Sequence, residues 1–291
     1  MIEPQLWVSV FEIGAFFSLI ALAYLLILEG AGFFNFAIGP YAMVAGLGTS
    51  WLVIEKKFSM VPAVLIAIAI VLVLSAATEV IIIRRIRKRS GGGDLPALVA
   101  VAAIVFAIEQ AAGLSFGRRP LPGQRLATFH RLQIGSAIIQ PTSLILVGTT
   151  LALFVLVAMW IKTTATGRSL RAVGDNSGAA QLLGLPVGRI RLVAFVVAGL
   201  IAAAAGLLFA PKAGVSFDRG LRWTVSGFLA LVIGGTGSTW APLLGGFVLA
   251  ATQVFVPYYL GGAATDYATL VLALVFFAFR PQGMFTRRVR V

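Results

Sequence analysis

The stretch EGAGFFNFAIGPYAMVAG, residues 29–46, separates two long apolar runs and decides how the chain folds. It contains a glutamate, an asparagine, a proline and several glycines among apolar residues. Glycines on both sides of Asn35, followed by Pro40, disfavour a continuous helix over residues 20–54. An unwound backbone is tolerated at membrane depth only where it is buried in protein or lines a cavity. The stretch therefore predicts a discontinuous membrane helix whose ends present polar groups to a passing solute.

The composition indicates an integral membrane protein. The 291 residues are 59% hydrophobic and 11% charged, with a mean hydropathy of +1.00, whereas a soluble domain carries about 25% charged residues. The net charge of +13 comes from basic clusters between apolar runs, as expected for anionic lipid headgroups. No basic stripe alternates with aromatic residues, so we expect no nucleic-acid binding.

Metal and disulfide chemistry is not expected. The sequence has no cysteine and a single histidine, His130, which we predict to be a loop residue. Cysteine sites and multi-histidine metal sites are therefore excluded, and we predict no cofactor.

The apolar runs predict an all-α integral membrane protein with eight or nine transmembrane helices, some of them discontinuous. Runs of spanning length need roughly 20 helical residues. They occupy residues 6–28, 60–83, 95–115, 137–161 and 191–210, with shorter or interrupted runs at 37–54, 223–260 and 266–280. We predict one transmembrane domain over residues 1–291, with an N-terminus outside and a C-terminus inside, because the basic clusters at 84–89 and 162–191 and the C-terminal arginines favour the cytoplasm.

The polar loop over residues 162–190 is predicted to contain two short helices. The first covers about 167–174. The sequence DNS at 175–177 supplies N-cap oxygens for the second, which ends near Gly184. Apolar contacts within the pair are expected from Leu170, Val173, Ala180 and Leu183. Such a hairpin suits docking of another protein, and an ordinary solvated loop is the alternative.

A second interruption resembles the first. The sequence LVIGGTGSTWAPLLGGF, residues 231–247, breaks an apolar run with glycines, hydroxyl residues and a proline. Broken segments in both halves of a chain are typical of inverted repeats around a central pathway.

Three acids lie within or at the ends of apolar runs, where a charge costs roughly 2.5–3.5 kcal/mol on insertion scales. Glu79 is expected to pair with Arg84 at the interface, and Glu29 to line the pathway or pair with another helix. Glu109 has no basic partner nearby in sequence. The small residues Gly199 and Gly206, with the alanines between them, predict close helix packing.

Three motifs resemble the permease subunits of branched-chain amino acid ABC importers of the LivH type. FNFAIGP at 34–40 is similar to the family's INFAHGE. GRSLRAVGDNSGAAQLLGL at 167–185 is similar to GRAMRAVAQN…AARLLGI. VIGGTGSTWAPLLGG at 232–246, followed by FRPQGMF at 279–285, is similar to VLGGLGSIPGALLGG…FRPQGLFG. The order and spacing agree over most of the chain.

The resemblance implies a permease that works with a related second permease, two cytoplasmic ATPases and an extracytoplasmic substrate-binding protein in the bacterial inner membrane. The chain has no phosphate-binding loop of the G-x-x-x-x-G-K-[ST] type, so it is not itself expected to be an enzyme. Expected contacts with the translocated solute are Glu29, Asn35, Gly39, Ser238 and Thr239. Coupling to the ATPases is expected from Gly167, Arg168, Arg171, Asp175, Asn176, Ala179 and Gly184.

The substrate implied by the resemblance is a branched-chain or other hydrophobic amino acid. Ile38 and Pro40 stand where the family usually has a histidine and an acid, so urea, short amides or small carboxylates are alternatives. An ion-coupled secondary transporter using Glu29 and Glu109, or a purely structural assembly protein, are further alternatives.

Overall fold

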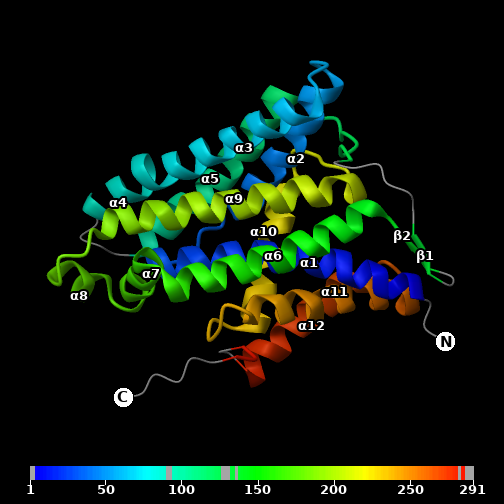
Figure 1. The fold of residues 1–291 in the computed structure, drawn as a ribbon. Coiled ribbons are helices and arrows are strands. Elements are labelled where there is room, and N and C mark those ends of the chain that lie inside the picture. Colours follow the sequence, from blue (N-terminus) through cyan, green and yellow to red (C-terminus); the bar gives the residue numbers. More distant parts are fainter. Residues whose placement is uncertain (1–3, 90–93, 126–131, 135–136, 281–282, 286–291) are drawn as a thin grey trace.

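The computed structural model describes residues 4–89, 94–125, 132–134, 137–280 and 283–285. In this part of the chain the structure is a bundle of helices, with one short hairpin of β1 (Leu132–Ile134) and β2 (Ala137–Ile139) (Figure 1). The helices are α1 (Pro4–Ala31), α2 (Ile38–Ile54), α3 (Met60–Ala77), η1 (Thr78–Ile83), α4 (Arg84–Arg89), α5 (Asp94–Phe116), α6 (Pro141–Thr163), α7 (Ala165–Asp175), α8 (Ser177–Leu182), α9 (Val187–Ala213), α10 (Arg219–Gly234), α11 (Ala241–Leu260) and α12 (Ala264–Phe279). His130 and Arg131 lie outside the described residues.

Six of the described helices are long and apolar enough to cross a membrane. They are Pro4–Ala31, Met60–Arg87, Pro96–Phe116, Pro141–Thr163, Val187–Ala213 and Ala241–Leu260. With the shorter apolar helices α2 and α12, the described residues contain eight apolar helices. The expected fold class of an all-α membrane protein is therefore confirmed.

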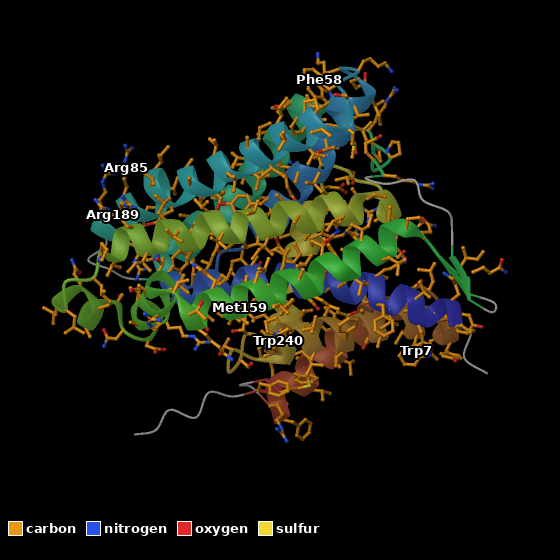
Figure 2. The ribbon with its side chains drawn as sticks, in the orientation of Figure 1. Trp7, Phe58, Arg85, Met159, Arg189 and Trp240 are labelled. Carbon is orange, nitrogen blue, oxygen red and sulfur yellow. The ribbon has the colours of Figure 1, made fainter. Side chains whose placement is uncertain are left out.

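The centre of the bundle is formed by α1 and α2. In α1, 89% of the most apolar 18-residue segment is buried. In the continuous helix Met60–Arg87, formed by α3, η1 and α4, the corresponding value is 22%. The outer helix α6 exposes apolar side chains such as Met159, and the N-terminal part of α1 exposes Trp7 (both labelled in Figure 2). Exposed apolar side chains on spanning helices are the surface that lipid covers.

Glycines allow the central helices to approach closely. A Cβ atom at Gly206 of α9 would lie 1.8 Å from the backbone oxygen of Ala42 in α2, and one at Gly199 would lie 2.8 Å from Cβ of Ser75. The predicted packing role of these small residues is therefore confirmed.

The first predicted interruption lies between α1 and α2. The helix α1 ends at Ala31, Gly32 has a φ of +76°, and α2 begins at Ile38. The backbone in between is held by Asn35, whose Oδ1 accepts a hydrogen bond of 3.0 Å from the Ala37 N–H. The prediction of a discontinuous helix is confirmed here.

The second predicted interruption lies between α10 and α11. Gly235, with a φ of +89°, ends α10, and α11 begins at Ala241. Residues 283–285 return to this loop and form backbone hydrogen bonds with it: Met284 N–H donates to Ile233 and Phe285 N–H to Gly234. The chain after α12 therefore stabilises the break.

Candidate coupling elbow and membrane cavity

The helices α7 and α8 and their connections, residues 164–185, form an ordered hairpin that we call the elbow. Thr164 caps α7, since its Oγ1 accepts a hydrogen bond of 3.0 Å from the Gly167 N–H. Asn176 caps α8 in the same way through Ala179, at 2.9 Å. The predicted capping by the DNS sequence is confirmed, and the Thr164 cap was not predicted although a threonine before a helix is a known signal.

The elbow has a small apolar core of its own. Leu170, Val173 and Ala180 are buried against Ile190 and Ala194 of α9. This core holds the elbow against the membrane helices, so it is not a loosely solvated loop.

The expectation that Leu183 would join this core is wrong. Leu183 is 82% exposed and its neighbour Leu182 is 91% exposed. The helix α8 ends at Leu182, and the chain reverses at Gly184, which has a φ of +79°. The turn points both leucines to the outside of the elbow, which sequence periodicity alone did not indicate.

The elbow is packed directly on the end of α1. A Cβ atom at Gly174 of α7 would lie 2.1 Å from the backbone oxygen of Glu29, and one at Gly30 would lie 2.4 Å from Cβ of Ala194. The Nε atom of Arg171 lies 3.9 Å from Oε1 of Glu29. Three helices therefore meet where α1 gives way to the first interruption (Figure 1).

The seven predicted coupling residues all lie on the elbow but have different surroundings. Arg171 faces Glu29, and buried Gly167 lies against the end of α6. Arg168 is exposed and its Nη1 donates a hydrogen bond of 3.1 Å to the Thr163 carbonyl. The remaining four are exposed: Asp175, Asn176, Ala179 and Gly184.

A buried cluster of charges lies near the same end of the bundle. Oε1 of Glu79, in η1, lies 3.7 Å from Nε of Arg84 and 3.9 Å from Nη1 of Arg191. The predicted Glu79–Arg84 pair is therefore confirmed. The second partner comes from α9 and is remote in sequence, so spacing could not reveal it.

The first interruption is fixed against α10. Thr224 of α10 donates a hydrogen bond of 2.8 Å to the Phe36 carbonyl, and its own carbonyl accepts one of 3.3 Å from Tyr24 of α1. On the other side, the Tyr41 hydroxyl donates to Thr78 at 2.8 Å. The non-helical segment is thus enclosed by protein, as an unwound backbone in a membrane requires.

Glu109 of α5 binds the beginning of α10. Its Oε1 accepts a hydrogen bond of 2.7 Å from the Leu221 N–H, and the residue is 6% exposed. The first N–H groups of a helix have no partner within the helix, so a carboxylate at this position satisfies one of them. The sequence shows no basic residue that could pair with Glu109, because its partner in the structure is the backbone N–H of Leu221.

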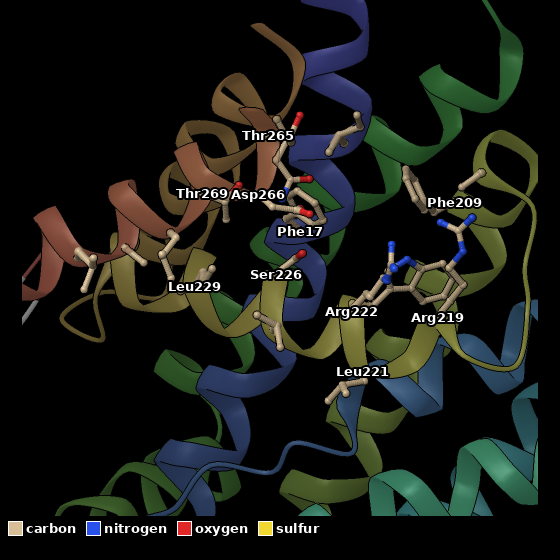
Figure 3. Close-up of a pocket in the computed structure, with 18 of the residues that line it drawn as sticks. Phe17, Phe209, Arg219, Leu221, Arg222, Ser226, Leu229, Thr265, Asp266 and Thr269 are labelled. Atoms are coloured by element: carbon tan, nitrogen blue, oxygen red, sulfur yellow. The ribbon is translucent and has the colours of Figure 1, made fainter. Parts of the chain in front are cut away.

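A cavity of about 880 Å³ lies beside α10 and α12 (Figure 3). Apolar side chains from α1 and α9 form part of its wall, such as Phe17 and Phe209. Its polar lining consists of Arg219, Arg222, Ser226, Gln253, Thr265, Asp266 and Thr269. Seven polar side chains thus gather beside an apolar wall in this cavity.

The five residues expected to contact the solute do not line this cavity. Glu29 lies at the elbow, and Asn35 is fully buried in the first interruption. Gly39 allows a close helix crossing, since a Cβ atom there would lie 2.1 Å from the Gly220 carbonyl oxygen. Ser238 Oγ accepts a hydrogen bond from the Trp240 N–H, and Thr239 is 4% exposed. The structure therefore places them at separate points along α1, α2 and α10–α11.

Comparison with known proteins identifies the family. Residues 7–279 match the family described as branched-chain amino acid transport system, permease component. The chain belongs to this family. It is therefore an ABC transporter permease and a multi-pass protein of the bacterial inner membrane, and the resemblance stated above is confirmed.

Individual relatives agree with this assignment. The chain is 26% identical to the high-affinity branched-chain amino acid permease LivH of Escherichia coli K12, over 94% of this chain and 92% of that protein. It is 25% identical to BraD of Pseudomonas aeruginosa, over 97% and 95%. A shorter match, 37% identity over 37% of this chain and 33% of that protein, is to the autoinducer 2 permease LsrC of Enterobacter sp..

A solved structure has the same fold. PsaBC from Streptococcus pneumoniae, in complex with Fab, superimposes with a TM-score of 0.52 at 15% identity, covering 94% of this chain and 91% of that chain. At this identity the similarity shows the fold alone.

Proposed function

We propose that the chain is the translocating subunit of an ABC importer, that it carries a small polar or amphipathic solute, and that separate ATPase subunits supply the energy. The observation that supports this is the contact between the elbow and α1. A protein that moves the elbow also moves Glu29 and Gly30, and the first interruption begins at the next turn. A displacement of the elbow at the cytoplasmic surface would therefore also displace the end of α1 and the first interruption.

We assign the ATPase interface to the outer surface of the elbow. Two adjacent leucines that are 91% and 82% exposed, Leu182 and Leu183, form an apolar contact of the kind that a partner protein buries. Asp175, Asn176 and Ala179 are exposed on the same short hairpin and would surround this contact. Three further residues would hold the elbow against α6 and α1 rather than contact the ATPase: Gly167, Arg168 and Arg171.

The solute would pass along the side of the bundle where the cavity opens. Ser226, Thr269 and Asp266 offer hydrogen-bonding groups there, next to an apolar wall that suits an aliphatic side chain. A second permease, related but not identical, would close the open side. Asn35, Gly39, Ser238 and Thr239 would then act on the path indirectly, by fixing the two interruptions.

The proposed substrate is a branched-chain or other hydrophobic amino acid, because full-length relatives carry that name. Ile38 and Pro40 both lie buried in α2, so the departures from the usual family motif do not line the cavity. Urea, a short amide or a small carboxylate is the second candidate, because a relative that matches part of the chain is named for a solute other than an amino acid.

The complete importer would contain this chain, the second permease, two cytoplasmic ATPases and an extracytoplasmic substrate-binding protein. The test is co-purification of the ATPase with the chain carrying Leu182→Ser and Leu183→Ser. Both side chains are exposed, so the permease should remain folded while ATPase is lost. The control is Leu200→Ser, an exposed leucine on α9 outside the elbow.

The alternatives predict different results. Retention of the ATPase by the double variant would overturn the interface. Solute uptake by the chain and its partner permease without any ATPase would indicate an ion-coupled secondary transporter. An intact complex that never transports would indicate a structural assembly protein.

A further inference from the structure

A second cavity lies at the cytoplasmic end of the bundle and is not part of the proposed pathway. It has a volume of about 600 Å³ and lies between α4, α8 and the start of α9. Its lining comprises Arg84, Arg87, Ser177, Gly178, Gln181, Leu185, Pro186, Val187, Gly188, Arg189 and Arg191. Figure 2 shows Arg189 near Arg85 at this end of the molecule.

The cavity is strongly basic. Four of its lining residues are arginines. Among the described residues, no aspartate or glutamate belongs to the lining. Glu79 is buried, does not line the cavity and pairs with Arg84 and Arg191. The lining itself is therefore positively charged, which favours an anionic ligand.

Two of the arginines are held in place by backbone carbonyls. Arg84 Nη2 donates a hydrogen bond of 2.9 Å to Gly188, and Arg87 Nη1 donates one of 2.9 Å to Ala31. Arg189 is exposed at the rim. The positive charge is therefore built into the fold by α4 and α9 rather than spread over mobile surface side chains.

The cavity lies at the ends of two helices that are long and apolar enough to span a membrane, where lipid headgroups are expected. Arg84 and Arg87 are at the cytoplasmic end of the span Met60–Arg87, and Val187 begins the span Val187–Ala213. One turn before Arg84, the side chains of Val80 and Ile81 are 39% and 51% exposed on the membrane side of the same helix. An exposed apolar surface next to a cavity lined by arginines suits a phospholipid, whose acyl chains are apolar and whose headgroup carries a phosphate.

We propose that this cavity binds the headgroup of an anionic phospholipid, with its acyl chains along η1 and α3. Guanidinium groups bind phosphate oxygens through paired N–H donors, and basic pockets at the cytoplasmic ends of membrane helices recognise anionic headgroups. Part of the elbow, at Ser177, Gly178 and Gln181, lines this cavity, so the proposal is tested on the chain without its ATPase.

The test is native mass spectrometry of the purified full chain in neutral detergent, with phosphatidylglycerol or phosphatidylcholine added at equal concentrations. Arg189→Gln removes a cavity charge, and Arg85→Gln removes an exposed charge from the neighbouring α4 that does not line the cavity. Both side chains are exposed, so circular dichroism should be unchanged. Competition with inorganic phosphate and with glycerol phosphate separates a lipid from a free anion.

The expected result is selective retention of phosphatidylglycerol, about fivefold weaker in Arg189→Gln and nearly unchanged in Arg85→Gln. Equal retention of the two lipids, or equal losses in the two variants, would overturn the proposal. Displacement of the lipid by inorganic phosphate or glycerol phosphate at the same concentration would also overturn it, because the cavity would then be a site for soluble phosphate.

Discussion

Arg171 of the elbow and Glu29 of α1 lie with Nε and Oε1 3.9 Å apart, although 142 positions separate them in the chain. The pair joins α7 to the last turn of α1, directly before the first interruption. Helix α7 lies against the same turn through Gly174. Electrostatic and steric contacts therefore act at one point, and each can be tested separately.

Exchange of the two charges tests the electrostatic contact. The Arg171 side chain is 33% exposed and that of Glu29 is 11% exposed, so solvent weakens the pair to about 0.5–1 kcal/mol. Glu29→Arg or Arg171→Glu alone should reduce ATP-driven uptake by the reconstituted importer, because each places like charges together. The double exchange should restore much of it. Additive losses in a double-mutant cycle would contradict the pairing.

The close approach of α7 to α1 predicts a steric effect. In Gly174→Ala the new Cβ atom would lie 2.1 Å from the Glu29 carbonyl oxygen, so the elbow must move away at a cost of about 1–3 kcal/mol. Uptake should fall while the ATPase still binds. The matched control is Gly178→Ala in α8, where the nearest atom is 3.4 Å away. Equal uptake by both variants would show that this contact transmits nothing.

The contact between Glu109 and α10 predicts a stability effect. Glu109→Ala removes the acceptor of the part-buried hydrogen bond from the Leu221 N–H, which should lower the free energy of unfolding by about 1–3 kcal/mol. Glu109→Gln keeps an oxygen at the same place and should cost less. Unfolding titrations in detergent measure both, and a larger loss in the glutamine variant would argue that the charge has another role.

The cavity beside α12 predicts a functional effect without a cost in stability. The Thr269 hydroxyl is buried in the cavity wall and has no hydrogen-bond partner. Thr269→Val preserves its shape and should leave the unfolding free energy unchanged or slightly higher, while changing the KM for uptake. Thr252→Val is the control, because Thr252 bonds to Val248 within α11 and does not line the cavity. An unchanged KM in the Thr269 variant would remove this residue from the path.

Local sequence signals predicted the helices and their interruptions well. Gly32 and Gly235 do take positive φ values at the two breaks, and Asn176 does cap α8. These outcomes depend on the residue and its immediate neighbours, so a single sequence contains the information.

Contacts across the bundle could not be predicted in this way. Arg191 reaches Glu79 from another helix, and Glu109 binds a backbone group, for which no residue type is diagnostic. The exposure of Leu183 depends on the direction of one turn at Gly184. The polar residues that line the cavity come from three helices, α10, α11 and α12. The sequence of each helix alone does not indicate that these residues lie together.

The central claim is that the elbow moves relative to the broken segments when the ATPases bind nucleotide. The chain has no cysteine, so Thr166→Cys on α7 and Thr236→Cys in the α10–α11 loop, both exposed, give two unique positions for spin labels. Double electron–electron resonance on the assembled importer would compare this distance with and without a non-hydrolysable ATP analogue. We expect the distance distribution to shift when the analogue binds. An identical distribution in both states, in a complex that retains its ATPases, would contradict the account.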